Sequence, residues 1–227
     1  KRNFDADQLV VIPDKIKDEQ AAAIFLKGLT AWYLLRKSYK VQPGDDVLLY
    51  AAAGGVGLIA CQWAKHLGAR VIGVVSNDEK AMLAKSNGCD DIILSDENIP
   101  ERVKELTDSI GVGVVYDSVG RDTFFSSLDS LKPHGILVTF GNASGPVDPF
   151  APAELAKRHS LYVTRPILAD FISERENLVE ASNELFDLVS SGVIKISINQ
   201  RYPLKDTRQA HIDLESRKTT GSTILIP

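Results

Sequence analysis

The chain has 227 residues, of which 44% are hydrophobic and 25% charged, enough for a large globular domain with a substantial core. Its net charge of −4 argues against the broad basic face that nucleic acid or an anionic membrane requires. Only two cysteines occur, Cys61 and Cys89, without a CxxC pair, so neither a disulfide framework nor a clustered zinc site is indicated. Such cysteine usage fits a reducing cytoplasm.

The first elements predicted along the chain are a short strand and a long helix. Residues 1–20 contain "LVVIPDKI", which is typical of a strand followed by a turn but carries no core of its own. Residues 20–37 are expected to form one amphipathic helix. The glycine-broken apolar stretch "AAAGGVGLIA" that follows falls short of the roughly 18 residues of a membrane span, so no membrane anchoring is expected.

From Val47 onward, short apolar runs alternate with helical stretches, a pattern typical of βαβ units. The strands are expected at 47–51, 71–75, 91–94, 114–118, 136–140 and 161–165, with helices at 56–67, 79–87 and 100–107. Six strands with helical crossovers predict an α/β fold with a Rossmann-type, doubly wound parallel sheet.

The segment after Pro166 differs from this alternating block. A long helix ends at Gly192, and a strand near 194–202, a helix near 207–217 and a terminal strand "STILI" follow. Together with residues 1–20, these pieces are expected to belong to a second domain.

A glycine cluster lies where the first strand of the block turns into its first helix. In the frame of the GxGxxG fingerprint it is Ala52-Ala53-Gly54-Gly55-Val56-Gly57, with alanine at the first position. The middle glycine lets the backbone approach a pyrophosphate, and the last lets helix and strand pack closely. The helix amides then face the phosphates, so the turn predicts dinucleotide binding.

The end of the second strand indicates which dinucleotide is bound. An acid there would grip the ribose hydroxyls of NAD and repel the 2′-phosphate of NADP, but this chain has Val75. Ser76, Asn77 and Lys80 can donate hydrogen bonds instead, which favours NADPH. A competing interpretation of "SNDE" is a capping box, in which Ser76 caps the next helix and Glu79 reaches back to it. Asp78 and Glu79 also bring negative charge close to the expected phosphate.

Many blocks in order resemble one known family. They include "AAAIFLKGLTAWYLL", "AAAGGVGLIACQWAKHLGARVIG", "VVYDSVGRDTF", "FGNASG", "SLYVTRP", "EASNELFDLVSSGVIK", "YPLKD" and "AH…LESRKTTGS". Together they resemble the NADPH:quinone oxidoreductases, the zeta-crystallin-like, zinc-independent branch of the medium-chain dehydrogenase/reductase superfamily. The resemblance runs over essentially the whole chain.

The resemblance implies a domain organisation. In this family a GroES-like catalytic domain precedes the nucleotide domain, and the chain returns to it afterwards. We therefore expect residues 1–23 to end the catalytic domain, 24–165 to form the Rossmann domain, and 166–227 to return to the catalytic domain. The chain is expected to lack most of the catalytic domain, and so to be poorly active alone.

The resemblance also implies site residues. Lys80 matches the family's phosphate-binding lysine, and Tyr33 and Arg217 match positions that contact the cofactor. The ends of strands four to six are expected to line the cofactor cleft, at Ser118, Phe140, Gly141, Asn142, Ala143, Arg165, Pro166 and Ile167. Zinc-dependent relatives carry a cysteine ligand in the region of Phe25 and Leu26, where this chain has none, so no metal is expected.

The function implied is the transfer of reducing equivalents from NADPH to a quinone, by a protein that forms a homodimer as the family does. The hydride comes from the cofactor, and a hydroquinone can take protons from solvent, so no catalytic residue is predicted. Two alternatives remain open. One is a zinc-free NADPH-dependent reductase of enones or alkenals, and the other is a non-catalytic NADPH-binding or RNA-binding protein of the zeta-crystallin type.

Overall fold

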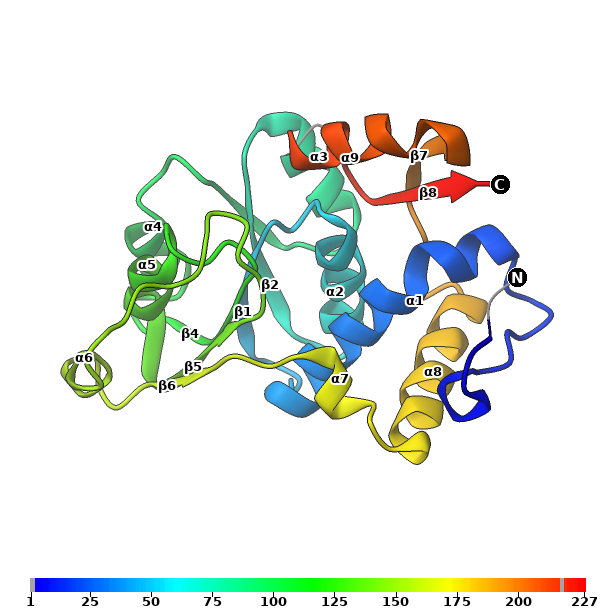
Figure 1. Cartoon of the computed structure of the whole chain (residues 1–227). Helices are drawn as coiled ribbons and strands as arrows, with labels where there is room; N and C mark the ends of the chain where they lie inside the picture. The colour runs from blue at the N-terminus through cyan, green and yellow to red at the C-terminus, as the bar shows by residue number, and fades with distance from the viewer. Residues whose placement is uncertain (1–2, 217–218) are drawn as a thin grey trace.

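The structure is a computed structural model that describes residues 3–216 and 219–227 (Figure 1). Its strands are β1 (Asp46–Tyr50), β2 (Arg70–Val75), β3 (Asp91–Leu94), β4 (Val112–Asp117), β5 (Leu131–Thr139), β6 (Tyr162–Thr164), β7 (Ile198–Pro203) and β8 (Ser222–Ile226). Its α-helices are α1 (Asp18–Tyr33), α2 (Gly55–His66), α3 (Asp78–Ser86), α4 (Ile99–Leu106), α5 (Phe124–Asp129), α6 (Ala153–Lys157), α7 (Leu168–Phe171), α8 (Arg175–Ser190) and α9 (Thr207–Glu215). None of the described helices is both long and apolar enough to cross a bilayer.

Six parallel strands form the central sheet in the order β3-β2-β1-β4-β5-β6. The chain winds outward from β1 to β3 and then returns to pair β4 with the other side of β1, so the winding reverses between β1 and β4. This is the order of a Rossmann-type doubly wound sheet, and the predicted fold class is confirmed.

The central strands are buried on both faces because helices cover each side of the sheet (Figure 1). In β1, Val47 and Leu49 pack into one core with α1, α2, α3 and α8, whereas Leu48 and Tyr50 face a second core with α4 and α5. This alternation follows from the two-residue period of a strand. Continuous apolar runs such as "VLLY" are therefore what a strand covered on both faces requires.

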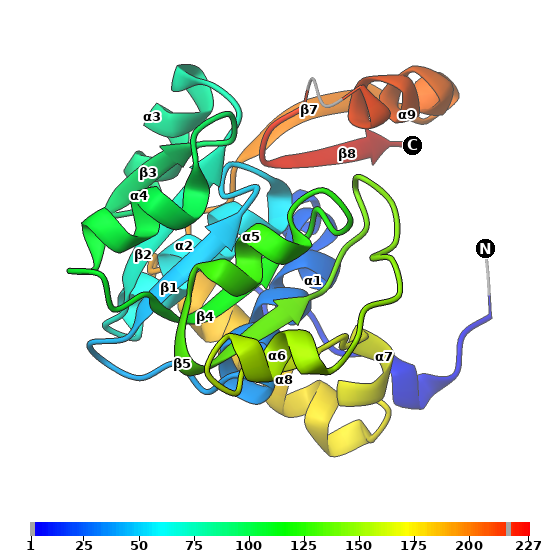
Figure 2. The same cartoon turned by 90° about the vertical axis from the view of Figure 1, so that its left-hand side faces the viewer.

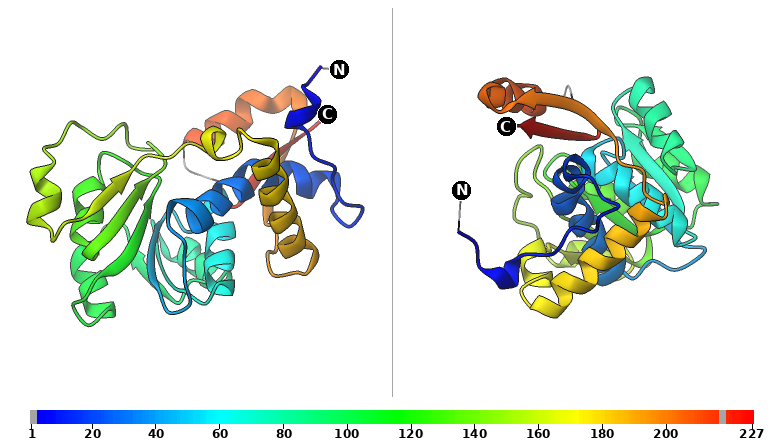
Figure 3. Two further views of the ribbon diagram at one scale, coloured as in Figure 1. Left: turned by 90° about the horizontal axis from the view of Figure 1, so that it is seen from below. Right: turned by 90° about the vertical axis from the view of Figure 1, so that its right-hand side faces the viewer.

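The C-terminal segment forms a smaller unit beside the sheet. Strands β7 and β8 pair in parallel, and α9 connects them. Figure 2 shows this unit above the strand ends. Helices α1 and α8 lie side by side (Figure 3) and approach closely, since a side chain at Gly28 would come within 2.5 Å of Leu185.

Two sequence-based predictions need correction at the level of elements. Residues 9–12, expected to be a strand, have no regular structure, because no described strand lies alongside to accept their hydrogen bonds. Val11 is 89% exposed there. The helix expected over 20–37 is α1 followed directly by a π-helical turn, Leu34–Ser38.

The turn between β1 and α2 is tightly packed. Ala51 adopts a positive φ of 52°, and the chain then enters α2 with Gly54 as the N-cap residue. A Cβ on Gly57 would lie 2.3 Å from the Ala51 oxygen and 2.7 Å from the Ala52 carbonyl. Gly57 therefore lets the helix lie against the end of the strand, as the fingerprint predicts.

Gly57→Ala should destabilise the fold, because the added methyl group overlaps backbone atoms that cannot rotate away. We expect a loss of about 1–3 kcal/mol in the free energy of unfolding, measured by urea titration. His66→Ala, at an exposed position of the same helix, serves as the control and should change this free energy little. Equal stability of the two variants would contradict the packing role.

Candidate functional site

A cleft of about 450 Å³ opens at the carboxyl ends of the strands on both sides of the point where the winding reverses. Five of the predicted site residues line it: Gly54, Ser76, Lys80, Ser118 and Ala143. Ligands of open α/β sheets bind at this place, because the loops after the strands diverge there. We call this hollow the strand-end cleft.

Gly54 and the following helix start form one wall of the strand-end cleft. Gly54 precedes the first turn of α2, whose backbone amides have no partner within the helix and so can bind an anion. Lys27 of α1 packs its aliphatic stem against Gly55, where an added Cβ would lie 2.7 Å from two of its carbons. Burial lowers the pKa of Lys27, and its ammonium adds positive charge close to this helix start.

The end of β2 forms the opposite wall, with a cap different from the one predicted. Asn77, not Ser76, is the N-cap of α3, and its side chain accepts a hydrogen bond from the Lys80 backbone nitrogen at 2.9 Å. Ser76 is released from capping because the helix begins one residue later. Its hydroxyl instead accepts a hydrogen bond from Lys80 Nζ at 3.1 Å. Ser76 and Lys80 thus present a hydroxyl and an ammonium together at the cleft.

The acids beside Lys80 lie elsewhere on α3. Neither Asp78 nor Glu79 lines the strand-end cleft, and Glu79 lines a separate hollow with Asn199 and Thr220. In the first turn of a helix, both carboxylates interact favourably with the helix dipole. The Glu79 carboxylate therefore lies at a different hollow from the one that Ser76 and Lys80 line.

Asp117, at the end of β4, organises the far side of the cleft. This buried carboxylate accepts hydrogen bonds from the Val119 and Gly120 nitrogens, at 2.7 and 3.1 Å, and from the Thr123 and Ser127 hydroxyls, at 2.7 and 2.8 Å. It thereby fixes the turn that carries Ser118. Sequence analysis did not single out Asp117, although an acid after four apolar strand residues is a usable signal.

The loop after β5 packs directly on this turn. The Ala143 nitrogen donates to the Ser118 oxygen at 3.2 Å, and a Cβ on Gly141 would lie 2.4 Å from the same oxygen. Gly141 is therefore needed for the close approach of the two loops. Phe140 and Asn142 flank it without lining the cleft.

A second group of predicted residues lies outside the lining of the strand-end cleft. Tyr33 is buried and stacks on Phe171 with ring centroids 4.9 Å apart. Burial raises its pKa to about 12, while the positive charge of Arg165 opposes the shift, so these two predicted residues are neighbours. Pro166 is buried beside them and Ile167 is 58% exposed. Arg217 lies outside the described residues.

Several lining residues were missed by sequence analysis. They are Tyr50, Ala51, Ala53, Val74, Val75, Ser95, Ile99, Val119, Asp122, Thr123, Leu214 and Thr219. Three of them, Tyr50, Val74 and Val75, are strand ends whose apolar pattern indicates only a core. Leu214 and Thr219 come from the C-terminal unit, and their position over the cleft depends on a distant chain return that no local pattern encodes.

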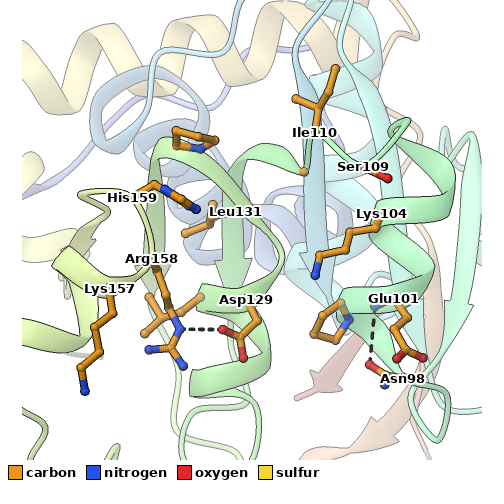
Figure 4. A pocket seen from close by; sticks show the side chains of 14 residues that line it. Asn98, Glu101, Lys104, Ser109, Ile110, Asp129, Leu131, Lys157, Arg158 and His159 are labelled. Atoms are coloured by element: carbon orange, nitrogen blue, oxygen red, sulfur yellow. Dashed lines mark hydrogen bonds and ion pairs between the residues drawn. The ribbon is translucent and has the colours of Figure 1, made fainter.

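A second hollow, of about 570 Å³, lies near the amino ends of β4 and β5 between α4 and α5 (Figure 4). None of the predicted site residues lines it. Two of its charged side chains are paired with each other, since Arg158 donates a hydrogen bond to Asp129 at 2.6 Å. It lies at the end of the sheet opposite to the one where dinucleotides bind.

A zinc ion does not fit the described residues. At the position where zinc-dependent relatives carry a cysteine, Leu26 is 69% exposed and Phe25 stacks on Phe186. Within residues 3–216 and 219–227, no three histidine, cysteine or acidic side chains come together as a metal site would require.

Comparison with known proteins places the chain among described relatives. The sequence profile of the zinc-binding dehydrogenase family matches residues 55–184. A quinone oxidoreductase of Salmonella typhimurium is 57% identical over 228 residues, covering 99% of this chain and 70% of that protein. A 2-haloacrylate reductase of a Burkholderia species is 45% identical, covering all of this chain and 69% of that protein.

A solved structure supports the same placement. The Escherichia coli quinone oxidoreductase, crystallised with NADPH, superposes with a TM-score of 0.95 at 54% identity, over 98% of this chain and 69% of that one. Both the sequence and the fold of this chain therefore match quinone oxidoreductases over nearly its whole length. It belongs to the zinc-binding dehydrogenase family and, within it, to the quinone oxidoreductases.

Proposed function

We propose that this protein is an NADPH-dependent quinone reductase. The observation that carries the proposal is the strand-end cleft, where the glycine turn at the start of α2 lies across from Ser76 and Lys80. Strand β2 ends on Val75 and not on an acid. Relatives of 52–57% identity are quinone oxidoreductases, and the similar Escherichia coli enzyme was crystallised with NADPH.

The cleft residues fit the parts of NADPH. The N-cap residue Gly54 and the first turn of α2, up to Gly57, would hold the pyrophosphate through backbone amides and the helix dipole. Ser76 and Lys80, with Asn77 beside them, would hold the 2′-phosphate through charge-assisted hydrogen bonds. Ser118 and Ala143 would line the path toward the nicotinamide. Tyr33, Phe140 to Asn142 and Arg165 to Ile167 would complete the site there. The family resemblance adds Arg217, which lies outside the described residues, to the cofactor contacts that we propose.

Bound NADPH would supply a hydride to the quinone, and the residues of the strand-end cleft would orient the cofactor and exclude water. We assign no side chain of this chain to proton transfer, because a hydroquinone can take its protons from solvent. The absence of a cysteine near Leu26 supports a reaction without zinc.

We also propose that residues 1–23 end the catalytic domain, that 24–165 form the Rossmann domain and that 166–227 return to the catalytic domain. We further propose that the protein is a cytoplasmic homodimer. The free thiols of Cys61 and Cys89 support a reducing compartment. Strand β6 supports the dimer, because it lies at the edge of the six-stranded sheet and its Tyr162 is 61% exposed. An edge strand offers unpaired backbone groups to a second copy.

A second candidate is reduction of an activated carbon–carbon double bond. It is favoured by the 45% identity to a 2-haloacrylate reductase. The strand-end cleft serves both functions equally, because both need the same cofactor.

Steady-state kinetics with NADPH should separate the two candidates. In the full-length protein we expect kcat/KM for simple benzoquinones and naphthoquinones to exceed that for 2-haloacrylates and enones by about tenfold or more. The opposite ranking would establish the second candidate. NADPH binding without turnover of either class would refute both and favour a binding protein.

Lys80→Ala should weaken NADPH binding much more than NADH binding, since only NADPH carries the 2′-phosphate. Losing one charge-assisted contact should cost about 1.5 kcal/mol of binding free energy. The Kd for NADPH, measured by fluorescence titration, should therefore rise about tenfold. Lys85→Ala, on the exposed face of the same helix, is the matched control and should alter neither Kd. Equal losses for the two cofactors would overturn the assignment of Lys80.

Tyr162→Asp should dissociate the homodimer, because it places a charge on the edge strand that a second copy would cover. Sedimentation velocity should show a dimer for the parent protein and a monomer for the variant at the same concentration. Tyr162→Phe keeps the apolar ring and should remain dimeric. A monomeric parent protein would rule out the homodimer.

A further inference from the structure

The two cysteines of the chain, 28 residues apart in sequence, meet inside the nucleotide domain. Cys61 lies in α2, and Cys89 lies in the turn between α3 and β3. Their sulfur atoms are 3.1 Å apart, and both are free thiols. The function proposed above uses neither of them.

We propose that Cys61 and Cys89 are an oxidisable pair that forms an intramolecular disulfide on reaction with a hydroperoxide. The two segments pass close to each other here, since a Cβ on neighbouring Gly88 would lie 3.0 Å from the Cys61 carbonyl oxygen. A disulfide requires the sulfurs to approach to about 2.05 Å, so a movement of about 1 Å suffices.

The surroundings allow that movement at Cys89. The Cys89 sulfur packs against Gly73 of β2, where a side chain would lie 2.7 Å from it, so no side chain of β2 presses on the sulfur at this position. Gly88, with a positive φ of 106°, connects Cys89 to the end of α3 by a short turn. Cys61 is held more firmly, within a helix and beside the Ala52 carbonyl oxygen at 3.8 Å. The turn, and not the helix, would therefore shift.

Burial decides which of the two sulfur atoms reacts with the peroxide first. Cys89 is 6% exposed and Cys61 is 0% exposed, so the peroxide meets Cys89 first. The hydrogen bond to Cys89, together with burial, raises the pKa of the Cys61 thiol well above its ordinary value, which keeps Cys61 protonated until a partner forms beside it.

The reaction balances with one hydroperoxide. The Cys89 sulfur attacks a peroxide oxygen, the O–O bond breaks, and Cys89 becomes a sulfenic acid while one water leaves. The Cys61 sulfur then attacks the Cys89 sulfur, the S–S bond forms, the S–O bond breaks, and hydroxide takes the Cys61 proton to leave as a second water. Two thiols are oxidised by two electrons, and hydrogen peroxide is reduced to two waters.

The disulfide would tie α2 to the turn that follows α3, and both helices carry proposed cofactor contacts. Helix α2 begins at the phosphate-facing glycine turn, and α3 begins beside Ser76 and carries Lys80. The cross-link would close a loop that contains β2 and α3, so it would restrict the unfolded chain and stabilise the folded one.

The folded full chain treated with hydrogen peroxide should lose two hydrogens by intact-mass spectrometry. It should then offer no thiol to an alkylating reagent after unfolding, and dithiothreitol should restore both thiols. The oxidised form should melt about 5–10 °C above the reduced form. Two alkylatable thiols after treatment, or gain of oxygen without loss of hydrogen, would overturn the proposal.

Single substitutions test the order of the steps. In Cys61→Ala, Cys89 should stop at a sulfenic acid that dimedone traps, and in Cys89→Ala, Cys61 should resist the same treatment. Oxidation of Cys61 in Cys89→Ala at the rate seen in the parent protein would contradict the order. If either variant does not fold, peptide mapping of the oxidised parent protein decides whether a Cys61–Cys89 cross-link is present.

Discussion

The parallel pairing of β4 with β1 is the constraint on which the candidate site depends. Because β2 and β4 lie on opposite sides of β1, the connections leave the sheet in opposite directions at this point. The loops after β1 and β4 therefore separate and leave a cleft at the carboxyl ends of the strands. The glycine turn, the end of β2 and the Ser118 turn face that cleft from different sides.

Two kinds of packing give the cleft its shape. At the glycine turn, the missing side chain of Gly57 lets α2 begin almost in contact with the Ala51 oxygen. At the far wall, the buried carboxylate of Asp117 receives four hydrogen bonds, which satisfies its charge away from water. The wall at the glycine turn thus depends on the missing side chain of Gly57. The far wall depends on the Asp117 side chain and its four hydrogen bonds.

The selection of the cofactor follows from charge placed by helix geometry. Ser76 and Lys80 are four residues apart and share a face of the chain, so their polar groups meet at the cleft. Glu79, one residue away from Lys80, lies about 100° around the helix and lines another hollow. Glu79 can therefore stabilise α3 through the helix dipole while it lines a hollow other than the one beside Lys80.

The sequence by itself determined the strand and helix periods, the glycine turn and the missing acid after β2, because each depends on residues close together in the chain. Its resemblance to a family also indicated Tyr33 and Arg165 as site residues. The tertiary structure decided that Asn77 caps α3 and that residues 9–12 form no strand, since a cap and a strand each need a specific partner. It also decided that Leu214 and Thr219 reach the cleft and that Cys61 meets Cys89. Those contacts join segments far apart in sequence, and only the folded sheet brings them within reach.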